Sequence, residues 1–303
     1  MALDSVTVRV PARVNLQLSV GPRKFDGYHD LVSVFQSVSL FDDVTVTKSH
    51  AGSGVTISVT GEQTYGVPED GSNLAVKAAH LIAEKCEIDI DAHIEVKKSI
   101  PVAGGMAGGS ADAAATLVAI DALYRLDLSR EELHQLGSQL GSDVPFMIAG
   151  GTAVGTGRGD ILTPALSRGT YHWVFALSSV GLSTPAVYEE CDRLRGDLDI
   201  AEPRQNEVLM QALLTGDPAR VGAVLSNDLQ AAACSLRPAL NLILDVGRDY
   251  GALGAIVSGS GPTIAFLVAH EEAGLDLAVA LTASGVVGSV ARASGPVHGA
   301  RVI

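Results

Sequence analysis

The sequence is organised around one glycine-rich segment, which reads Pro101-Val102-Ala103-Gly104-Gly105-Met106-Ala107-Gly108-Gly109-Ser110-Ala111. Alternating residues before it (92–100) predict a strand, and alanine-rich residues after it (111–123) predict a helix. Glycines let the backbone adopt positive φ and approach a ligand closely. Backbone N–H groups and the dipole at the start of the helix would then attract an anion. We expect Ser110 and Asp112 to cap this helix.

The glycine segment matches neither of two common nucleotide-binding patterns. It is not G-x-x-x-x-G-K-[ST], because no lysine follows the glycines, and it is not G-x-G-x-x-G. Taken alone, it permits two interpretations, which are a phosphate-binding loop and a tight turn that packs a helix on a sheet.

The residues before the glycine segment predict a β-rich region with one helix. Apolar and polar residues alternate over residues 6–10 and again, after Pro11, over residues 14–20. A period of two places Arg13 and Asn15 on the same face of one strand. Residues 73–85 predict a helix, and a second helix begins after a capping-box sequence at Ser129 and ends near residue 141.

The residues after the glycine segment predict a second structural unit. A glycine cluster over 150–159 leads us to divide the chain into domains at residues 1–152 and 153–303. The uncharged stretch 251–269 is long enough for a membrane span, but its centre, 258–263, would break a helix in lipid. We interpret it as two buried strands joined by a tight loop. Long β-rich and α-rich runs favour an α+β fold over a doubly wound sheet.

Composition and charge exclude several classes of partner. The chain has 303 residues, 47% of them hydrophobic, and a formal net charge of −13, so we expect a globular protein that does not bind nucleic acid. Cys86, Cys191 and Cys234 are widely spaced without a C-x-x-C pattern, which indicates reduced thiols in a cytoplasmic protein. The N-terminus has no basic region followed by an apolar run, so we expect neither a signal peptide nor a membrane partner.

Three motifs, in order along nearly the whole chain, resemble those of the GHMP kinases, the superfamily of galacto-, homoserine, mevalonate and phosphomevalonate kinases. They are residues 11–16 (Pro-Ala-Arg-Val-Asn-Leu), the glycine segment, and residues 258–263 (Ser-Gly-Ser-Gly-Pro-Thr). The resemblance implies a two-domain α+β fold with the active site in the cleft between the domains. It also implies ATP as phosphate donor, with Mg²⁺ held mainly by the nucleotide.

The same resemblance assigns residues to the nucleotide. The whole glycine segment, 101–111, would bind ATP, and Asn73 would lie in the adenine pocket. Gly259, Ser260 and Gly261 would form the loop that closes over the phosphates. The residues themselves leave a second role open for Asn73, because asparagine is also a favoured helix N-cap.

Two finer features resemble the branch of the superfamily that phosphorylates the 2-hydroxyl of a cytidine-diphosphate-linked methylerythritol. They are residues 26–29 (Asp-Gly-Tyr-His) and 140–146 (Leu-Gly-Ser-Asp-Val-Pro-Phe). The resemblance implies a catalytic carboxylate and a set of substrate-binding residues, which are Asp143, followed by Asn15, Tyr28, His29, Thr184 and Tyr188. Tyr28 and His29 would hold the cytosine, with Tyr188 stacked opposite Tyr28.

One departure from the family and several alternatives remain. Arg13 stands where the family has a catalytic lysine, and a guanidinium keeps the positive charge but cannot act as a neutral base. Asp143 could also form a turn or cap, and Tyr188 could be a core aromatic. A homoserine- or mevalonate-type kinase and a non-catalytic nucleotide-binding relative are therefore the alternative functions.

Overall fold

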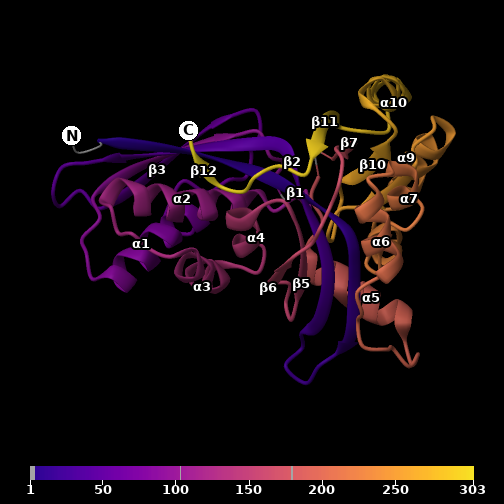
Figure 1. Cartoon of the computed structure of the whole chain (residues 1–303), viewed down its shortest axis with the longest axis horizontal. Helices are drawn as coiled ribbons and strands as arrows, with labels where there is room; N and C mark the ends of the chain where they lie inside the picture. Colours follow the sequence, from indigo (N-terminus) through magenta and orange to yellow (C-terminus); the bar gives the residue numbers. More distant parts are fainter. Residues whose placement is uncertain (1–3, 103, 179) are drawn as a thin grey trace.

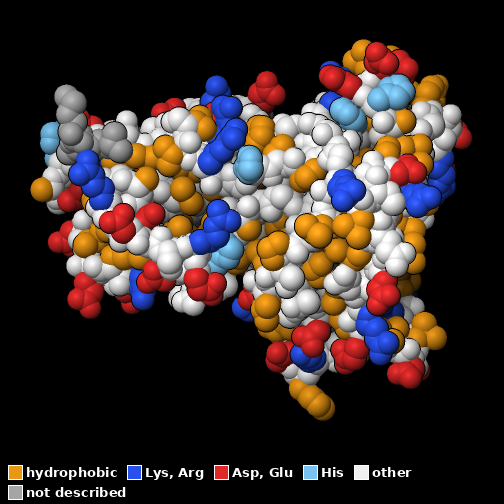
Figure 2. Space-filling model, in the orientation of Figure 1, with side chains coloured by type: hydrophobic (Ala, Val, Ile, Leu, Met, Phe, Trp, Pro, Cys, Tyr) orange, Lys and Arg blue, Asp and Glu red, His pale blue; other side chains and the backbone are white. Residues whose placement is uncertain are grey.

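The computed structural model describes residues 4–102, 104–178 and 180–303, so Ala103, one of the predicted ATP-binding residues, lies outside the described part of the chain. Two sheets, each with its own helices, form the molecule (Figure 1). On the face shown in Figure 2, acidic and basic side chains are interspersed rather than segregated. The α+β fold class is confirmed.

The first sheet has eight strands, and two long antiparallel strands, β1 and β2, run through its centre. The strands are β1 (Ser5–Arg23), β2 (His29–Lys48), β3 (Val55–Gly61), β4 (Ala92–Lys98), β5 (Thr152–Thr156), β6 (Ile161–Pro164), β8 (Ser226–Asn227) and β12 (Arg301–Val302). Helices gather on one side of this sheet (Figure 1): α1 (Leu74–Cys86), α2 (Gly108–Tyr124), α3 (Arg130–Leu140) and α4 (Val144–Ala149).

The second sheet is antiparallel, with the strand order β11-β7-β10-β9. Its strands are β7 (Tyr171–Leu177), β9 (Gly254–Val257), β10 (Ile264–Val268) and β11 (Ser289–Gly295). The remaining helices lie around it (Figure 1): α5 (Thr184–Arg195), α6 (Glu207–Thr215), α7 (Pro218–Gly222), α8 (Gln230–Leu236), α9 (Ala239–Asp249) and α10 (Glu271–Ser284). The buried Trp173 indole on β7 donates to Gln36 Oε1 on β2 at 3.0 Å, which ties the two sheets together.

Several local predictions are confirmed. Asn73 caps α1, Ser129 opens α3 with a complete capping box, and the stretch 251–269 contains β9, a turn and β10. Pro11 does not divide the first strand, because it lies at a shift in the β1–β2 register. No helix in the described ranges is long and apolar enough to span a membrane.

The predicted caps of α2 are wrong. This helix begins at Gly108, three residues earlier than predicted, and its N-cap is Ala107, which has a φ of +62° and no capping side chain. Ser110 and Asp112 therefore lie inside the helix. Asp112 is buried and pairs with Lys98 instead. Gly108 and Gly109 form its first turn, and glycine is permissive enough to adopt helical as well as turn conformations.

The predicted domain division at residues 152 and 153 remains a prediction. The strand β5 begins at Thr152 and pairs with β2 in the first sheet, and β6 follows it there.

Candidate active site

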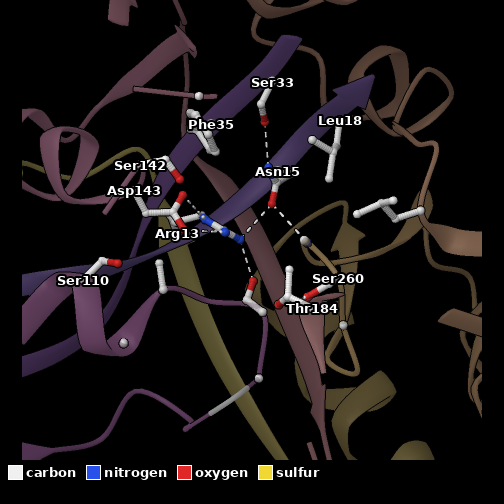
Figure 3. Close-up of a pocket in the computed structure, with 18 of the residues that line it drawn as sticks. Arg13, Asn15, Leu18, Ser33, Phe35, Ser110, Ser142, Asp143, Thr184 and Ser260 are labelled. Atoms are coloured by element: carbon white, nitrogen blue, oxygen red, sulfur yellow. Dashed lines mark hydrogen bonds and ion pairs between the residues drawn. The ribbon is translucent and has the colours of Figure 1, made fainter. Parts of the chain in front are cut away.

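The three predicted motifs meet at one cavity of about 410 Å³ (Figure 3). Its wall combines the middle of β1, the glycine segment at the N-terminus of α2, the residue before α4, and the turn between β9 and β10. These segments are far apart in sequence. The turn meets β1 through the hydrogen bond from the Gly259 backbone to Asn15, and it meets the glycine segment through the bond from Ser258 to Gly105.

Arg13 lies at the centre of this cavity. Its guanidinium donates to both oxygens of Asp143, from Nη2 to Oδ2 at 2.9 Å and from Nε to Oδ1 at 3.3 Å. Its Nη1 donates to Asn15 Oδ1 at 2.8 Å and to the carbonyl oxygen of Gly105 at 2.5 Å. The guanidinium carbon lies 5.7 Å from the centroid of the Phe35 ring. These contacts fix both the arginine and the carboxylate at the glycine segment.

Asn15 joins the first motif to the third. Its Oδ1 also accepts from the Gly259 backbone at 3.1 Å, while its Nδ2 donates to Ser33 Oγ at 2.7 Å. The predicted common face of Arg13 and Asn15 is thus confirmed by their direct hydrogen bond. Asn15 is 1% exposed and bonds to three partners, so it holds the loop 259–261 in place as well as lining the cavity.

The glycine segment also contacts the third motif directly. Ser258 Oγ donates to the Gly105 carbonyl at 2.7 Å, and a Cβ atom at Gly105 would overlap the carbonyl oxygen of Ser258. Gly105 has a φ of +71°, so both its conformation and its surroundings require glycine there.

The two glycines at the start of α2 have different surroundings. A Cβ atom at Gly108 would lie 3.1 Å from Lys98 Nζ, in the packed interior. At Gly109, which is exposed, it would meet only Leu74 Cδ1 at 3.6 Å. The open space above Gly109, in front of the helix N-terminus, is where an anion would fit. Met106 is fully buried, so its side chain packs in the core.

Both polar atoms of the Asn73 side chain have a partner within the protein. Its Oδ1 accepts from the Ala75 backbone at 2.9 Å, and its Nδ2 donates to the Pro68 carbonyl at 2.7 Å. The N-cap interpretation therefore accounts for this side chain. Its predicted role in an adenine pocket remains a prediction.

A buried charge cluster that the sequence reasoning missed lies behind the glycine segment. Lys98 Nζ donates to Asp42 at 2.6 Å and to Asp112 at 2.8 Å, and Asp42 also accepts from the backbone of Ser99 and Ile100. Burial opposes the charge on Lys98, but the two carboxylates raise its pKa. Burial also raises the pKa of Asp112, to about 8, against the pull of Lys98. The available signal was a lysine on the apolar face of an alternating strand.

This cluster holds both ends of the glycine segment. Asp42 fixes the backbone that enters it, and Asp112 lies in the helix that leaves it, with one ammonium group between them. Lys98 faces the interior and does not line the cavity.

A second cavity, of about 600 Å³, opens beside the first and contains the predicted pyrimidine-binding residues Tyr28, His29 and Tyr188. The two cavities are adjacent, and they share five lining residues: Leu31, Ser142, Arg158, Thr184 and Tyr188. Tyr28 is 61% exposed at the rim.

Tyr188 contacts His29 and not Tyr28. The ring centroids of Tyr188 and His29 are 5.3 Å apart, and His29 Nε2 lies 2.9 Å from Asp192 Oδ1. Burial, with a further contribution from the Asp143 carboxylate, raises the pKa of Tyr188 to about 12, so its hydroxyl is neutral at physiological pH. Stacking of a base between Tyr28 and Tyr188 remains a prediction. Thr184 Oγ1 lies 2.8 Å from Ser260 Oγ at the junction of the cavities.

The chain matches two family models, and solved structures share its fold. The model for the GHMP kinases N terminal domain matches residues 73–151, and the model for GHMP kinases C terminal matches residues 209–287. A crystal structure of a 4-(cytidine 5'-diphospho)-2C-methyl-D-erythritol kinase is 31% identical, with a TM-score of 0.76 over 95% of this chain and 98% of that one. Homoserine kinase from Cytophaga hutchinsonii, at 21% identity and a TM-score of 0.76, shares the fold.

Curated relatives are closer in sequence. The 4-diphosphocytidyl-2-C-methyl-D-erythritol kinase of Thermobifida fusca is 55% identical, over all of this chain and 99% of its own length. The enzyme of the same name from Mycolicibacterium smegmatis is 53% identical, over 99% of this chain and 92% of its own length. This level of identity over the full length, together with the three motifs meeting at one cavity, shows that the chain belongs to the 4-diphosphocytidyl-2-C-methyl-D-erythritol kinases of the GHMP kinase superfamily.

Proposed function

We propose that this chain transfers the γ-phosphoryl group of ATP to the 2-hydroxyl of 4-diphosphocytidyl-2-C-methyl-D-erythritol, a step of the methylerythritol phosphate route to isoprenoid precursors. The observation that carries the proposal is that the two cavities lie side by side and share five lining residues. One has the Arg13–Asp143 pair beside the glycine segment, and the other has His29 and Tyr188 in its wall. A nucleotide-linked alcohol could thus lie with its base in one and its hydroxyl in the other.

Asp143 is the proposed proton acceptor. Phosphoryl transfer needs an attacking oxygen that is oriented and can lose its proton, and a carboxylate beside that oxygen can do both. The two hydrogen bonds from Arg13 fix the orientation of this carboxylate. Its side chain is 22% exposed, so it remains accessible from the cavity.

Arg13 is proposed to act as a fixed positive charge. Its guanidinium stays protonated throughout the accessible pH range, so it can stabilise negative charge on the transferring phosphoryl group but cannot release a proton. The N–H groups around Gly109 and Ser110, at the start of α2, would hold the phosphates of ATP.

Mg²⁺ would enter with the nucleotide. Within the described residues, no group of three or more His, Cys, Asp or Glu side chains is arranged to hold a metal ion. The cavity wall presents the hydroxyl of Ser110, and Mg²⁺ commonly takes one or two protein oxygens beside phosphates (Figure 3). This donor fits a metal carried by ATP, which would neutralise phosphate charge.

ADP release from ATP and Mg²⁺ tests the proposal, with the cytidine substrate, homoserine and mevalonate as separate acceptors. We expect turnover with the cytidine substrate only. Asp143→Asn should bind both ligands in calorimetry while kcat falls by about 10²-fold or more, because an amide cannot accept the proton. Turnover with homoserine or mevalonate alone would favour those kinases, and binding without any turnover would favour a non-catalytic relative. A kcat within threefold of wild type in the variant would remove Asp143 from the mechanism.

A further inference from the structure

His29 and Asp192 form a polar pair in the wall of the second cavity. His29 is the first residue of β2, and its side chain is 5% exposed. Asp192 and Tyr188 are four residues apart on α5, so they lie on the same face of that helix. Both contact the imidazole of His29: Tyr188 through its ring and Asp192 through the 2.9 Å bond from Nε2 to Oδ1.

The pairing with a carboxylate sets the tautomer of His29. An ionised carboxylate can only accept hydrogen bonds, so Nε2 must carry the proton that forms the bond. In a neutral imidazole, Nδ1 is then an acceptor. The other oxygen of Asp192 lies 3.9 Å from Nη1 of Arg23.

The Nδ1 atom is free to bind a ligand. No described residue forms a hydrogen bond with it. It is also not among the completely buried polar atoms that lack a partner, so it is accessible from outside the protein. Because His29 lines the cavity with Tyr28 and Tyr188, Nδ1 offers a lone pair at the same wall as the two aromatic rings.

We propose that Asp192 is a positioning residue that fixes His29 as an acceptor and thereby selects a pyrimidine with an exocyclic amino group over one with a carbonyl at the same position. The inference rests on the proposed function, because it takes the second cavity as the base site. Cytosine presents an N–H donor where uracil presents an oxygen, so uracil would bring two lone pairs together. Such an unmade bond in a desolvated site costs roughly 10- to 100-fold in affinity.

Replacement of Asp192 by asparagine tests this idea, since a side-chain amide can donate to Nε2 as well as accept from it, and either tautomer is then satisfied. The matched control is Asp197→Asn, the same change at an exposed residue just beyond α5. Calorimetry would compare cytidine diphosphate with uridine diphosphate. Steady-state kinetics would compare kcat/KM for the cytidine substrate and its uridine counterpart.

We expect the cytidine-to-uridine ratio to be at least about tenfold in the wild type and the control, and to fall severalfold in Asp192→Asn, with uridine binding improved. An unchanged ratio, or an equal loss for both nucleotides, would overturn the proposal, since the latter is what a purely structural role predicts. A wild type that binds neither nucleotide would instead refute the base site itself. The binding arm is independent of turnover, so it separates this inference from a failure of the proposed reaction.

Discussion

The most informative perturbation is at Arg13, where the chain departs from the lysine of its family. Arg13→Met removes the charge and the four hydrogen bonds of the guanidinium. Two of its acceptors keep another donor, because Asn15 Oδ1 still accepts from Gly259 and the Gly105 carbonyl still accepts from Ser258. The loss therefore falls on Asp143, which gives up both of its bonds to Arg13.

The magnitude follows from this uneven loss. Asp143 is partly exposed and can be hydrated, so the free energy of unfolding should fall by only about 1–3 kcal/mol, less than for a fully buried pair. Catalysis should suffer more, because a preorganised charge at a reacting phosphoryl group typically contributes about 10²–10³ in kcat, or about 3–4 kcal/mol. Arg13→Lys should retain activity, since an ammonium preserves the charge.

The assay is kcat against pH for the wild type, Arg13→Lys and Arg13→Met, with calorimetric binding of a non-hydrolysable ATP analogue as the control for folding. A fixed-charge role predicts active arginine and lysine forms. A role in proton release predicts a slow wild type and a new pH limb in the lysine variant, because only the ammonium can titrate there. Full activity in Arg13→Met would refute both roles.

Three further predictions concern the phosphate loop, the base site and the buried cluster. Gly109→Val should remain folded, because its Cβ meets only Leu74 at 3.6 Å, yet lose ATP binding by filling the phosphate space; unchanged calorimetric affinity would make the segment a packing turn. Tyr188→Ala should weaken the cytidine substrate by about 1–3 kcal/mol with ATP affinity preserved, whereas equal losses in titrations of both ligands would point to a packing defect. Burial raises the pKa of the Asp112 carboxyl from 3.8 to about 8, against the attraction of Lys98, and Asp112→Asn removes this carboxyl. The folded wild type keeps a proton there that the unfolded chain loses, so in urea unfolding its stability should fall more steeply than that of the variant as pH rises from about 4 to about 8; parallel slopes would contradict the raised pKa.

The local elements of the fold were readable because their signals are local. The alternation around Arg13 and Asn15 indicates which side chains share a face of the strand. The capping box at Ser129 indicates where a helix begins. The start of α2 was misplaced because glycines carry no side chain, so the sequence could not tell whether Gly108 and Gly109 turn or enter the helix.

The sequence by itself determined the α+β class, the three motifs and the type of chemistry, since these depend on residue periodicity and on short contiguous patterns. Only the tertiary structure decided which partners each side chain has. It placed Arg13 against Asp143, Lys98 between two buried carboxylates, and His29 against Asp192. Each of these pairs joins residues on different elements, and such a contact depends on how β-strands, helices and loops pack against one another, which no local pattern encodes.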